Sequence, residues 1–294
     1  MTETRRSAQV ACTRVTVDGG EISMLHLAAP TVAGASASRS FVVLHGIGMA
    51  GNTFVGLAER LSAEGEVWAP DMPGFGDSPE RPTPLSIPQT ADLLARWMLV
   101  AGVRTPVTLV GHSMGTQVAA EICVRHPQLV DRLVLMAPTV DASARSATAQ
   151  ALRMADDLRD DSLRVLGLGL ANYVKVGPKW FADKLGIMLD HRIEQVLPDV
   201  RVPTLVLRGS EDRVCPDPWV RHCAQLTPGA SFVQLPGVGH ETMIANPALA
   251  AQAILDFLRA TDAANAVDAA DARGAAPLHG ETGHQVSRGT ASGH

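Results

Sequence analysis

The segment Val107-Thr-Leu-Val-Gly-His-Ser113-Met-Gly115-Thr-Gln-Val-Ala-Ala-Glu-Ile joins two stretches of different hydrophobic period. The apolar, β-branched run 107–110 is typical of a buried parallel strand, and 116–124 predicts a helix with one apolar face. The residues between them, Gly-His-Ser-Met-Gly, match G-x-S-x-G. In that pattern the serine lies on a sharp turn, and its neighbours are small because strand and helix approach closely there. We therefore expect the Ser113 hydroxyl at the edge of a sheet, beside a helix N-terminus.

A serine in this position could also act only as the N-cap of the following helix. The pattern by itself is short, so it needs structural context before it indicates chemistry. The strand before it and the helix after it supply that context. We therefore favour a nucleophilic role for Ser113 over a capping role.

Composition describes a soluble globular protein and excludes several classes of partner. The chain has 294 residues, of which 46% are hydrophobic and 19% charged, enough for a sizeable core. A net charge of −5 argues against binding to nucleic acid or to an anionic membrane. We find no signal-peptide pattern and no apolar stretch that could span a bilayer. We expect a cytoplasmic protein acting on a small molecule, with the oligomeric state left open.

The four cysteines show no Cys-x-x-Cys spacing; they are Cys12, Cys123, Cys215 and Cys223. A disulfide between Cys215 and Cys223 is conceivable. We expect free thiols instead, as is usual in a reducing cytosol.

Predicted strands and helices alternate along most of the chain. The strands are 9–17, 21–28, 41–44, 67–70, 107–110, 133–136, 204–207 and 231–235; the helices are 52–64, 86–101, 116–124, 217–225 and 246–259. The first two strands flank Asp18-Gly19-Gly20, a turn signal that indicates an antiparallel hairpin. The remaining alternation predicts an α/β fold with a mostly parallel central sheet flanked by helices.

Three regions follow from these patterns. Residues 1–140 and 199–261 carry the strand signals and form the predicted core. Between them, 141–198 lacks strand signals and predicts several short helices, which we interpret as a helical cap. Residues 262–294 have no aromatic side chain and few branched aliphatic ones, so we predict a disordered C-terminal tail.

An acid and a histidine follow later strands in the order that a serine nucleophile requires. A serine hydroxyl needs a base, and the base needs an orienting acid. After such a turn the chain order is serine, acid, histidine. Asp212 follows strand 204–207 and His240 follows strand 231–235, so both should reach the carboxyl edge of the sheet. We predict that Ser113, Asp212 and His240 are the catalytic residues.

An oxyanion hole would complete the site. Two backbone N–H groups are expected to stabilise the developing charge, those of Ile47 and Met114, each contributing on the order of 3 kcal/mol. Ile47 lies in the Gly-flanked loop after His45-Gly46, and Met114 begins the helix after the serine.

Other polar residues are expected to have surface, capping or structural roles. Glu211 and Asp217 compete with Asp212 as surface or capping acids. We expect His45 to hold the oxyanion loop rather than transfer a proton, and His112 to pack beside the turn. The tail histidines, His279, His284 and His294, lack ligand spacing, so we predict no metal and no cofactor.

The predicted substrate pocket consists of side chains from the first loop and the cap: His45, Tyr173, Trp180, Phe181 and Met188. Aromatic and Met side chains at such positions also commonly pack one layer onto another. Both interpretations stay open for the cap residues.

Together the motifs resemble those of the α/β-hydrolase superfamily. They are His45-Gly46, the Asp71–Ser78 segment Asp-Met-Pro-Gly-Phe-Gly-Asp-Ser, Gly111-His-Ser-Met-Gly115, Gly209-x-x-Asp212-x-x-x-Pro216 and Gly239-His240. The resemblance runs from about residue 20 to 260 and is greatest to serine hydrolases with a small helical cap. It implies nucleophile, acid and base roles at Ser113, Asp212 and His240, and a cap at 141–198.

Departures from related families narrow the activity that the resemblance implies. Haloalkane dehalogenases and epoxide hydrolases carry an aspartate where Ser113 stands. Proline iminopeptidases usually have a longer Gly/Pro run than Ile47-Gly48-Met49. Carbon–carbon hydrolases usually have an aromatic residue where Glu241 follows His240. Thr116 replaces a glycine common after Ser-Met-Gly, which affects helix packing and not the chemistry.

We therefore predict a metal-independent carboxylic ester hydrolase for small or medium apolar acyl groups. Carbon–carbon hydrolysis of a dienoate, lactone opening and perhydrolysis are alternatives, because each uses the same triad. A ligand receptor or scaffold on this fold is the non-enzyme alternative, disfavoured because a binder needs no activated serine.

Overall fold

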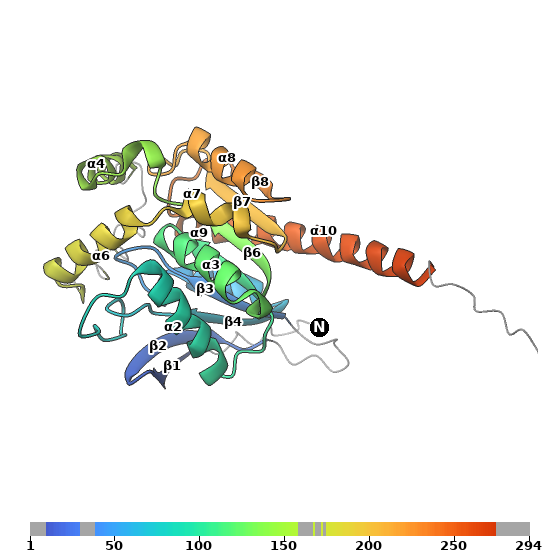
Figure 1. Ribbon diagram of the computed structural model, residues 1–294, viewed down its shortest axis with the longest axis horizontal. Helices are drawn as coiled ribbons and strands as arrows, with labels where there is room; N and C mark the ends of the chain where they lie inside the picture. The colour runs from blue at the N-terminus through green and yellow to red at the C-terminus, as the bar shows by residue number, and fades with distance from the viewer. Residues whose placement is uncertain (1–9, 30–38, 158–166, 168–171, 173–174, 275–294) are drawn as a thin grey trace, which may run out of the picture. The chain divides into compact units, whose positions relative to one another are not determined.

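The computed structural model describes residues 10–29, 39–157, 167, 172 and 175–274. Within these residues one sheet has the strand order β1-β2-β4-β3-β5-β6-β7-β8 (Figure 1). The strands are β1 (Val10–Val17), β2 (Gly20–Leu27), β3 (Arg39–Leu44), β4 (Gly65–Pro70), β5 (Val107–His112), β6 (Val130–Met136), β7 (Thr204–Gly209) and β8 (Ser231–Leu235). From β4 through β8 every neighbouring pair is parallel, which confirms the predicted mostly parallel sheet.

The antiparallel part of the sheet is the predicted hairpin. β1 pairs with β2 from Val10↔Leu27 to Val17↔Gly20, and β2 continues antiparallel to β4. Asp18 (φ 49°) and Gly19 (φ 72°) both have positive φ at the turn. Two positive φ values match the twist of the strands they connect, which is why Asp-Gly is favoured at this position.

Helices cover the sheet, and one of them begins at the serine turn. They are η1 (Gly51–Phe54), α1 (Val55–Leu61), α2 (Ile87–Val100), α3 (Met114–Arg125), η2 (Pro127–Leu129), α8 (Asp217–Leu226), α9 (Thr242–Ala245) and α10 (Pro247–Gly274). α2 begins at the predicted capping box, in which Ser86 and Gln89 exchange side-chain and backbone hydrogen bonds. α2 and α3 lie side by side on the face of the sheet nearest the viewer in Figure 1.

The only regular secondary structure that the structure describes between β6 and β7 is helical. It includes η3 (Ala142–Ala144), α4 (Ala147–Asp157), α6 (Pro178–Asp190), α7 (Ile193–Val196) and η4 (Leu197–Asp199). We call residues 141–198 the insertion. Three hydrogen bonds join it to α3 and to the loop before α2: Gln117 Nε2 to the Met188 carbonyl (2.9 Å), Lys184 Nζ to the Leu85 carbonyl (3.0 Å), and His191 Nε2 with Glu121 Oε1 (2.9 Å).

The C-terminal helix is longer than predicted. α10 continues past the expected end at 259 to Gly274, so the prediction of disorder is wrong for 262–274. This stretch is rich in alanine, the best helix former, and contains no proline or glycine before Gly274. By its contacts the chain divides into the units Met1–Phe257 and Leu258–His294. Residues 275–294 lie outside the described residues, and their disorder stays a prediction.

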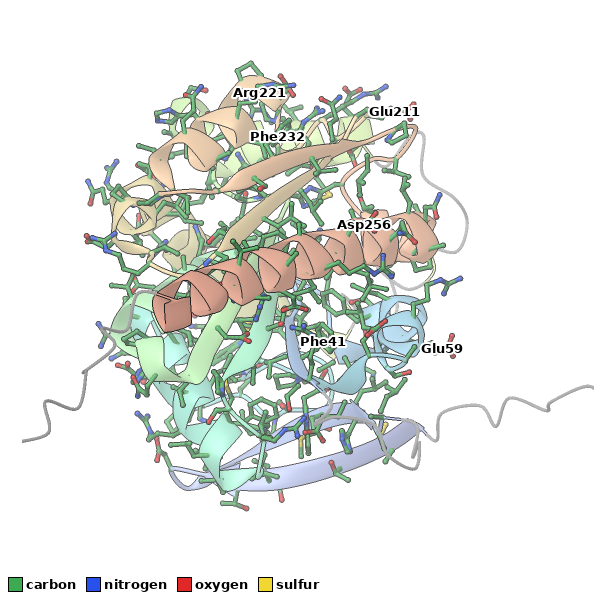
Figure 2. The ribbon with its side chains drawn as sticks, turned by 90° about the vertical axis from the view of Figure 1, so that its right-hand side faces the viewer. Phe41, Glu59, Glu211, Arg221, Phe232 and Asp256 are labelled. Carbon is green, nitrogen blue, oxygen red and sulfur yellow. The ribbon has the colours of Figure 1, made fainter. Side chains whose placement is uncertain are left out.

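α8 is tied to the edge strand that leads to the predicted histidine loop. The guanidinium of Arg221 on α8 lies 4.4 Å from the ring centre of Phe232 on β8, and Figure 2 shows the two side chains at the same edge of the molecule. Such a cation–π contact covers the exposed ring face of an edge strand. Among the described residues no helix is long and apolar enough to cross a membrane.

The junction between β5 and α3 packs main chain against main chain. A Cβ on Gly111 would lie 2.4 Å from the Gly115 carbonyl oxygen, and one on Gly115 would lie 2.2 Å from the Leu44 carbonyl oxygen. β3 and β5 are neighbours in the sheet, with Leu44 opposite Gly111. Both glycines are therefore required for α3 to begin where it does.

We expect Gly115→Ala to lower the free energy of unfolding by about 1–3 kcal/mol, because the new Cβ forces α3 away from β3. Gly186→Ala, in the middle of α6, is the matched control, since its Cβ would meet nothing within 4 Å. Alanine there should stabilise the protein by about 0.5–1 kcal/mol. Urea unfolding followed by circular dichroism measures both. Equal effects of the two substitutions would contradict this account of the junction.

Candidate active site

Ser113 occupies the strained turn that its sequence context predicts. Its φ of 51° and ψ of −121° lie outside the regions that non-glycine residues normally adopt. Its backbone N–H donates to the Met136 carbonyl of β6 (3.0 Å), and its own carbonyl accepts from the Thr116 hydroxyl (2.6 Å). These bonds on both sides hold a conformation that the turn alone would not maintain. Thr116, which departs from the family pattern, thus stabilises the turn through a hydrogen bond from the first turn of α3.

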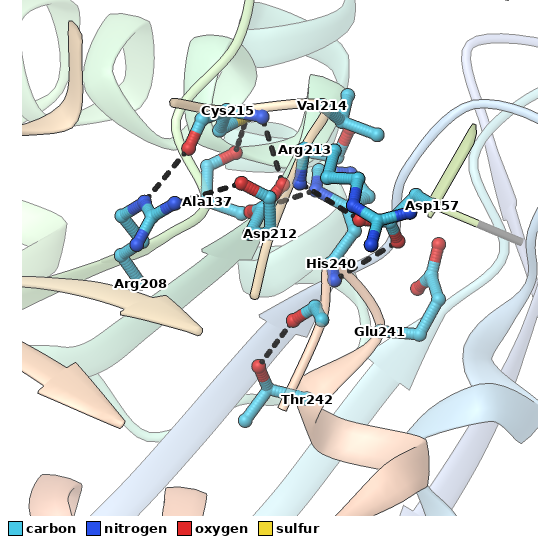
Figure 3. Close-up of polar contacts among 12 residues, drawn as sticks. Ala137, Asp157, Arg208, Asp212, Arg213, Val214, Cys215, His240, Glu241 and Thr242 are labelled. Carbon is cyan, nitrogen blue, oxygen red and sulfur yellow. Dashed lines mark hydrogen bonds and ion pairs between the residues drawn. The ribbon is translucent and has the colours of Figure 1, made fainter. Parts of the chain in front are cut away.

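Asp212 is the acid that meets the histidine. It lies in the turn after β7, only 2% exposed, and its Oδ2 is 3.1 Å from Nδ1 of His240 (Figure 3). Its Oδ1 accepts the backbone N–H of Cys215 at 2.8 Å. The two competing acids are placed elsewhere: Glu211 is exposed, and Asp217 binds Arg221 on its own helix.

His240 is buried in the loop after β8 and is 1% exposed. Nδ1 of His240 points at Asp212. The other ring nitrogen, Nε2, has no hydrogen-bond partner among the described residues, so it is not hydrogen-bonded to Ser113 Oγ. The serine turn and the histidine loop nevertheless touch. His112, the residue before Ser113, contacts the His240 carbonyl through its own Nε2 at 3.1 Å, and the two rings are 4.9 Å apart.

The acid loop and the histidine loop are fixed to each other by backbone contacts. The Ser210 N–H donates to the Leu235 carbonyl (2.7 Å), and the Glu211 N–H donates to the Val238 carbonyl (3.0 Å). Gly209 permits this approach, because a Cβ there would lie 2.2 Å from the Val238 carbonyl oxygen. The two loops therefore form one unit at the carboxyl edge of the sheet.

Arg208, which the sequence reasoning did not single out, organises the acid loop. It is 6% exposed, and its guanidinium donates to three backbone carbonyls, those of Cys215 (2.9 Å), Ser210 (3.2 Å) and Asp212 (2.8 Å). The planar fork of arginine suits several acceptors in one loop. The sequence does contain an indication of this role: Arg208 directly follows the apolar run 204–207, and a buried charged side chain needs hydrogen-bond partners.

Asp157, at the C-terminal end of α4, is a second residue that the sequence reasoning missed. Its carboxylate accepts the backbone N–H groups of Arg213 (2.8 Å) and His240 (3.2 Å). No local pattern marks it, because its partners lie far along the chain on two different loops.

The charges at the site favour a protonatable His240 beside a neutral His112. Burial by itself lowers the pKa of His240, but the adjoining Asp212 carboxylate outweighs it and holds the pKa well above the ordinary 6.5. Cys215 adds no charge near neutrality, because burial raises its pKa to about 11. For His112, burial first and the positive charge of His240 second lower the pKa well below its ordinary value.

His45 organises the loop after β3. It is fully buried; its Nε2 accepts the Met72 backbone N–H (2.9 Å), and its Nδ1 donates to the Gly46 carbonyl (2.8 Å). Because both ring nitrogens bind main chain and the ring is buried, this placement favours a structural role for His45 over contact with the substrate. A Cβ on Gly46 would lie 3.1 Å from Ser113 Cβ, so this loop lies against the serine turn.

The two predicted oxyanion donors belong to the segments that touch at this point. Ile47 directly follows Gly46, and Met114 directly follows Ser113 at the first position of α3. The first N–H groups of a helix have no partner within it, so the Met114 amide is available to a ligand.

The remaining pocket residues are divided between packing and the surface. Trp180 and Met188 are buried, and Phe181 is partly exposed. The Trp180 indole lies where a Cβ of Gly74 would be, so it packs on the loop after β4. This placement favours the packing interpretation for Trp180. Tyr173 lies outside the described residues.

Among the residues that the structure describes, two buried groups of potential metal ligands include His240. They are His112, His240 and Glu241, and Asp212, Cys215 and His240, each with ligand atoms within 4.8 Å of one another. In the second group Asp212 already binds His240, and the Cys215 thiol stays protonated near neutrality, whereas a metal ligand must be a thiolate. In the first, the His112 nitrogen that faces His240 donates its proton to a carbonyl. Neither group suits a metal without rearrangement.

Comparison with known proteins adds relatives of known activity. A curated pimeloyl-[acyl-carrier protein] methyl ester esterase from Chromobacterium violaceum is 27% identical over 232 residues, spanning 70% of this chain and 88% of the relative. An esterase from Thermogutta terrifontis superposes with a TM-score of 0.69 at 24% identity, over 86% of this chain and 98% of the other.

A third similar structure is an enol-lactonase from Burkholderia xenovorans, with a TM-score of 0.71 at 21% identity over 84% of this chain and all of the other. At such identities the structures show a shared fold. The sequence model of the alpha/beta hydrolase family matches residues 41–253, which include the serine turn, the acid loop and the histidine loop. The chain therefore belongs to the alpha/beta hydrolase family.

Proposed function

We propose that this enzyme is a serine hydrolase that cleaves carboxylic esters of small or medium apolar acyl groups through an acyl-enzyme. The observation that carries the proposal is the buried Asp212–His240 hydrogen bond in a loop that touches the Ser113 turn. An acid bound to Nδ1 fixes the tautomer in which Nε2 can accept a proton. That nitrogen is buried and has no other partner among the described residues.

In the first half of the reaction, Ser113 Oγ attacks the ester carbonyl while His240 Nε2 takes its proton. The Ile47 and Met114 amides bind the oxyanion of the tetrahedral intermediate. His240 then returns the proton to the leaving alkoxide, which departs as the alcohol. Rotation of the Ser113 side chain brings its hydroxyl to Nε2, as catalytic hydrogen bonds often tighten only when substrate is bound.

In the second half, water replaces the alcohol. His240 removes a proton from the water, the resulting hydroxide attacks the acyl carbonyl, and Ser113 leaves with the proton that His240 returns. Asp212 stays ionised throughout and stabilises the imidazolium. No step requires a metal or an organic cofactor.

The substrate class rests on the relatives and on the apolar side chains of the insertion. The curated relative named above is an esterase, and the Thermogutta structure is also that of an esterase. Phe181 of α6 is a partly exposed apolar side chain of the insertion, and we assign it to the acyl pocket. We assign the same role to Met188, from which a few per cent of the surface remains exposed.

Replacing the nucleophile tests the mechanism. Ser113→Ala should lower kcat for p-nitrophenyl butyrate on the order of 10⁵-fold or more, because the hydroxyl forms the acyl bond. A fluorophosphonate probe should label the wild type at Ser113 and leave the variant unlabelled. Ser86→Ala, at the N-cap of α2, is the control: it should lose about 1 kcal/mol of stability and keep its turnover. An active Ser113→Ala protein would refute the proposal.

The pH profile tests the role of His240. The base must be neutral to accept a proton, so kcat/KM should fall as the pH drops through the pKa of His240. Because Asp212 raises that pKa, we expect the acidic limb above pH 6.5. Asp212→Asn should move the limb to lower pH and reduce kcat on the order of 10⁴-fold. A limb that stays in place in this variant would show that another group titrates.

A further inference from the structure

We propose that Asp157 of the insertion is a positioning residue for the catalytic relay, because its carboxylate ties the backbone of the acid loop to the backbone of the histidine loop. This inference rests on the function proposed above. Asp157 touches none of the reacting atoms, so it acts through the placement of His240 and Asp212.

The two carboxylate oxygens bind different loops. Oδ1 accepts the N–H of Arg213, the residue after Asp212, at 2.8 Å, and Oδ2 accepts the N–H of His240 itself at 3.2 Å (Figure 3). Asp157 is 5% exposed, so little water competes for these oxygens. One side chain therefore fixes the main chain beside the acid and at the base.

The histidine loop is shaped to receive this carboxylate. A Cβ on Gly239 would lie 3.3 Å from Asp157 Oδ2 and 3.6 Å from Oδ1. A larger residue at 239 would press on the carboxylate and move either the loop or α4. The glycine before His240 thus gives the loop room to turn and lets it rest directly on Asp157.

The charge of Asp157 also acts on His240. The pKa of Asp157 lies above its ordinary value, chiefly because of burial and further because of the Asp212 charge; the two backbone donors and the charge of His240 offset part of this rise. The titratable groups that face it are thus His240 and Asp212, with Glu241 beside His240 and Arg213 pairing with Asp156. An ionised Asp157 favours the imidazolium that forms during proton transfer. Its removal should therefore lower the pKa of His240.

An isosteric substitution separates positioning from packing. Asparagine in place of Asp157 keeps the shape, but one oxygen becomes an NH₂ group that faces a backbone N–H, so one of the two bonds is lost. The neighbouring Asp156 offers a matched control. Its carboxylate is half-exposed and pairs with the Arg213 guanidinium at 3.5 Å.

The experiment compares Asp157→Asn and Asp156→Asn with the wild type. The readouts are the rate of fluorophosphonate labelling at Ser113, kcat and KM for p-nitrophenyl butyrate, the pH profile of kcat/KM, and the Tm. For Asp157→Asn we expect labelling and kcat to fall about 10- to 100-fold, since small misplacements of catalytic groups have effects of this size. KM should stay within about twofold, and the acidic limb should move to lower pH. Asp156→Asn should match the wild type.

The outcomes are distinguishable. Folded Asp157→Asn protein that is labelled at the wild-type rate, with an unmoved acidic limb, would overturn this inference and leave the proposed function intact. A wild type that the probe does not label would overturn the proposed function, and the inference with it. A lowered Tm with unchanged labelling would assign Asp157 to packing alone.

A second variant covers the case in which Asp157→Asn does not fold. Gly239→Ala places a methyl group 3.3 Å from Asp157 Oδ2, at a residue without positive φ. We expect labelling and kcat to fall about tenfold, with KM nearly unchanged. Wild-type labelling by folded Gly239→Ala protein would count against the positioning role.

Discussion

The contact of main chain with main chain where α3 leaves β5 is the constraint on which the site depends. With no Cβ at Gly111 or Gly115, the helix begins directly against the carboxyl ends of β3 and β5. Ser113 is thereby forced into a strained conformation, which bonds to β6 and to Thr116 maintain. The same contact brings the loop after β3 against the serine turn. The proposed nucleophile and the proposed oxyanion donors thus occupy neighbouring positions because two backbones touch.

The other half of the site is assembled by buried charges that bind backbone. Arg208 binds three carbonyls of the acid loop, and Asp212 and Asp157 each accept backbone N–H groups while adjoining His240. A buried charge is costly unless hydrogen bonds satisfy it, so each of these side chains fixes the loop that surrounds it. Asp157 comes from the insertion, so its carboxylate connects that segment to the acid and histidine loops.

Membership of the alpha/beta hydrolase family indicates the class of reaction but not the substrate. The family places the chain among hydrolases, and its esterase relatives favour ester cleavage over the receptor alternative. Fold alone does not select a substrate. That choice depends on the insertion, where Trp180 packs on the loop after β4 and Phe181 stays partly exposed. α6 thus carries both a side chain that packs the insertion onto the core and a partly exposed apolar side chain, which we propose meets the acyl group.

Local sequence determined the hairpin, the parallel strands and the serine turn, and it placed Asp212 and His240 on loops that the structure brings together. Each of these features depends on residues that are neighbours in the chain. The strands follow from the hydrophobic period, the turns from residues that adopt a positive φ, and the two loops from their position directly after a strand. Local sequence did not reveal the last part of α10, because the low apolar content of 262–274 indicated disorder although the stretch is rich in alanine. Only the tertiary structure decided the roles of Arg208, His45 and Asp157. Their partners are backbone groups on loops that become neighbours when the sheet forms, and backbone groups carry no signature in the sequence.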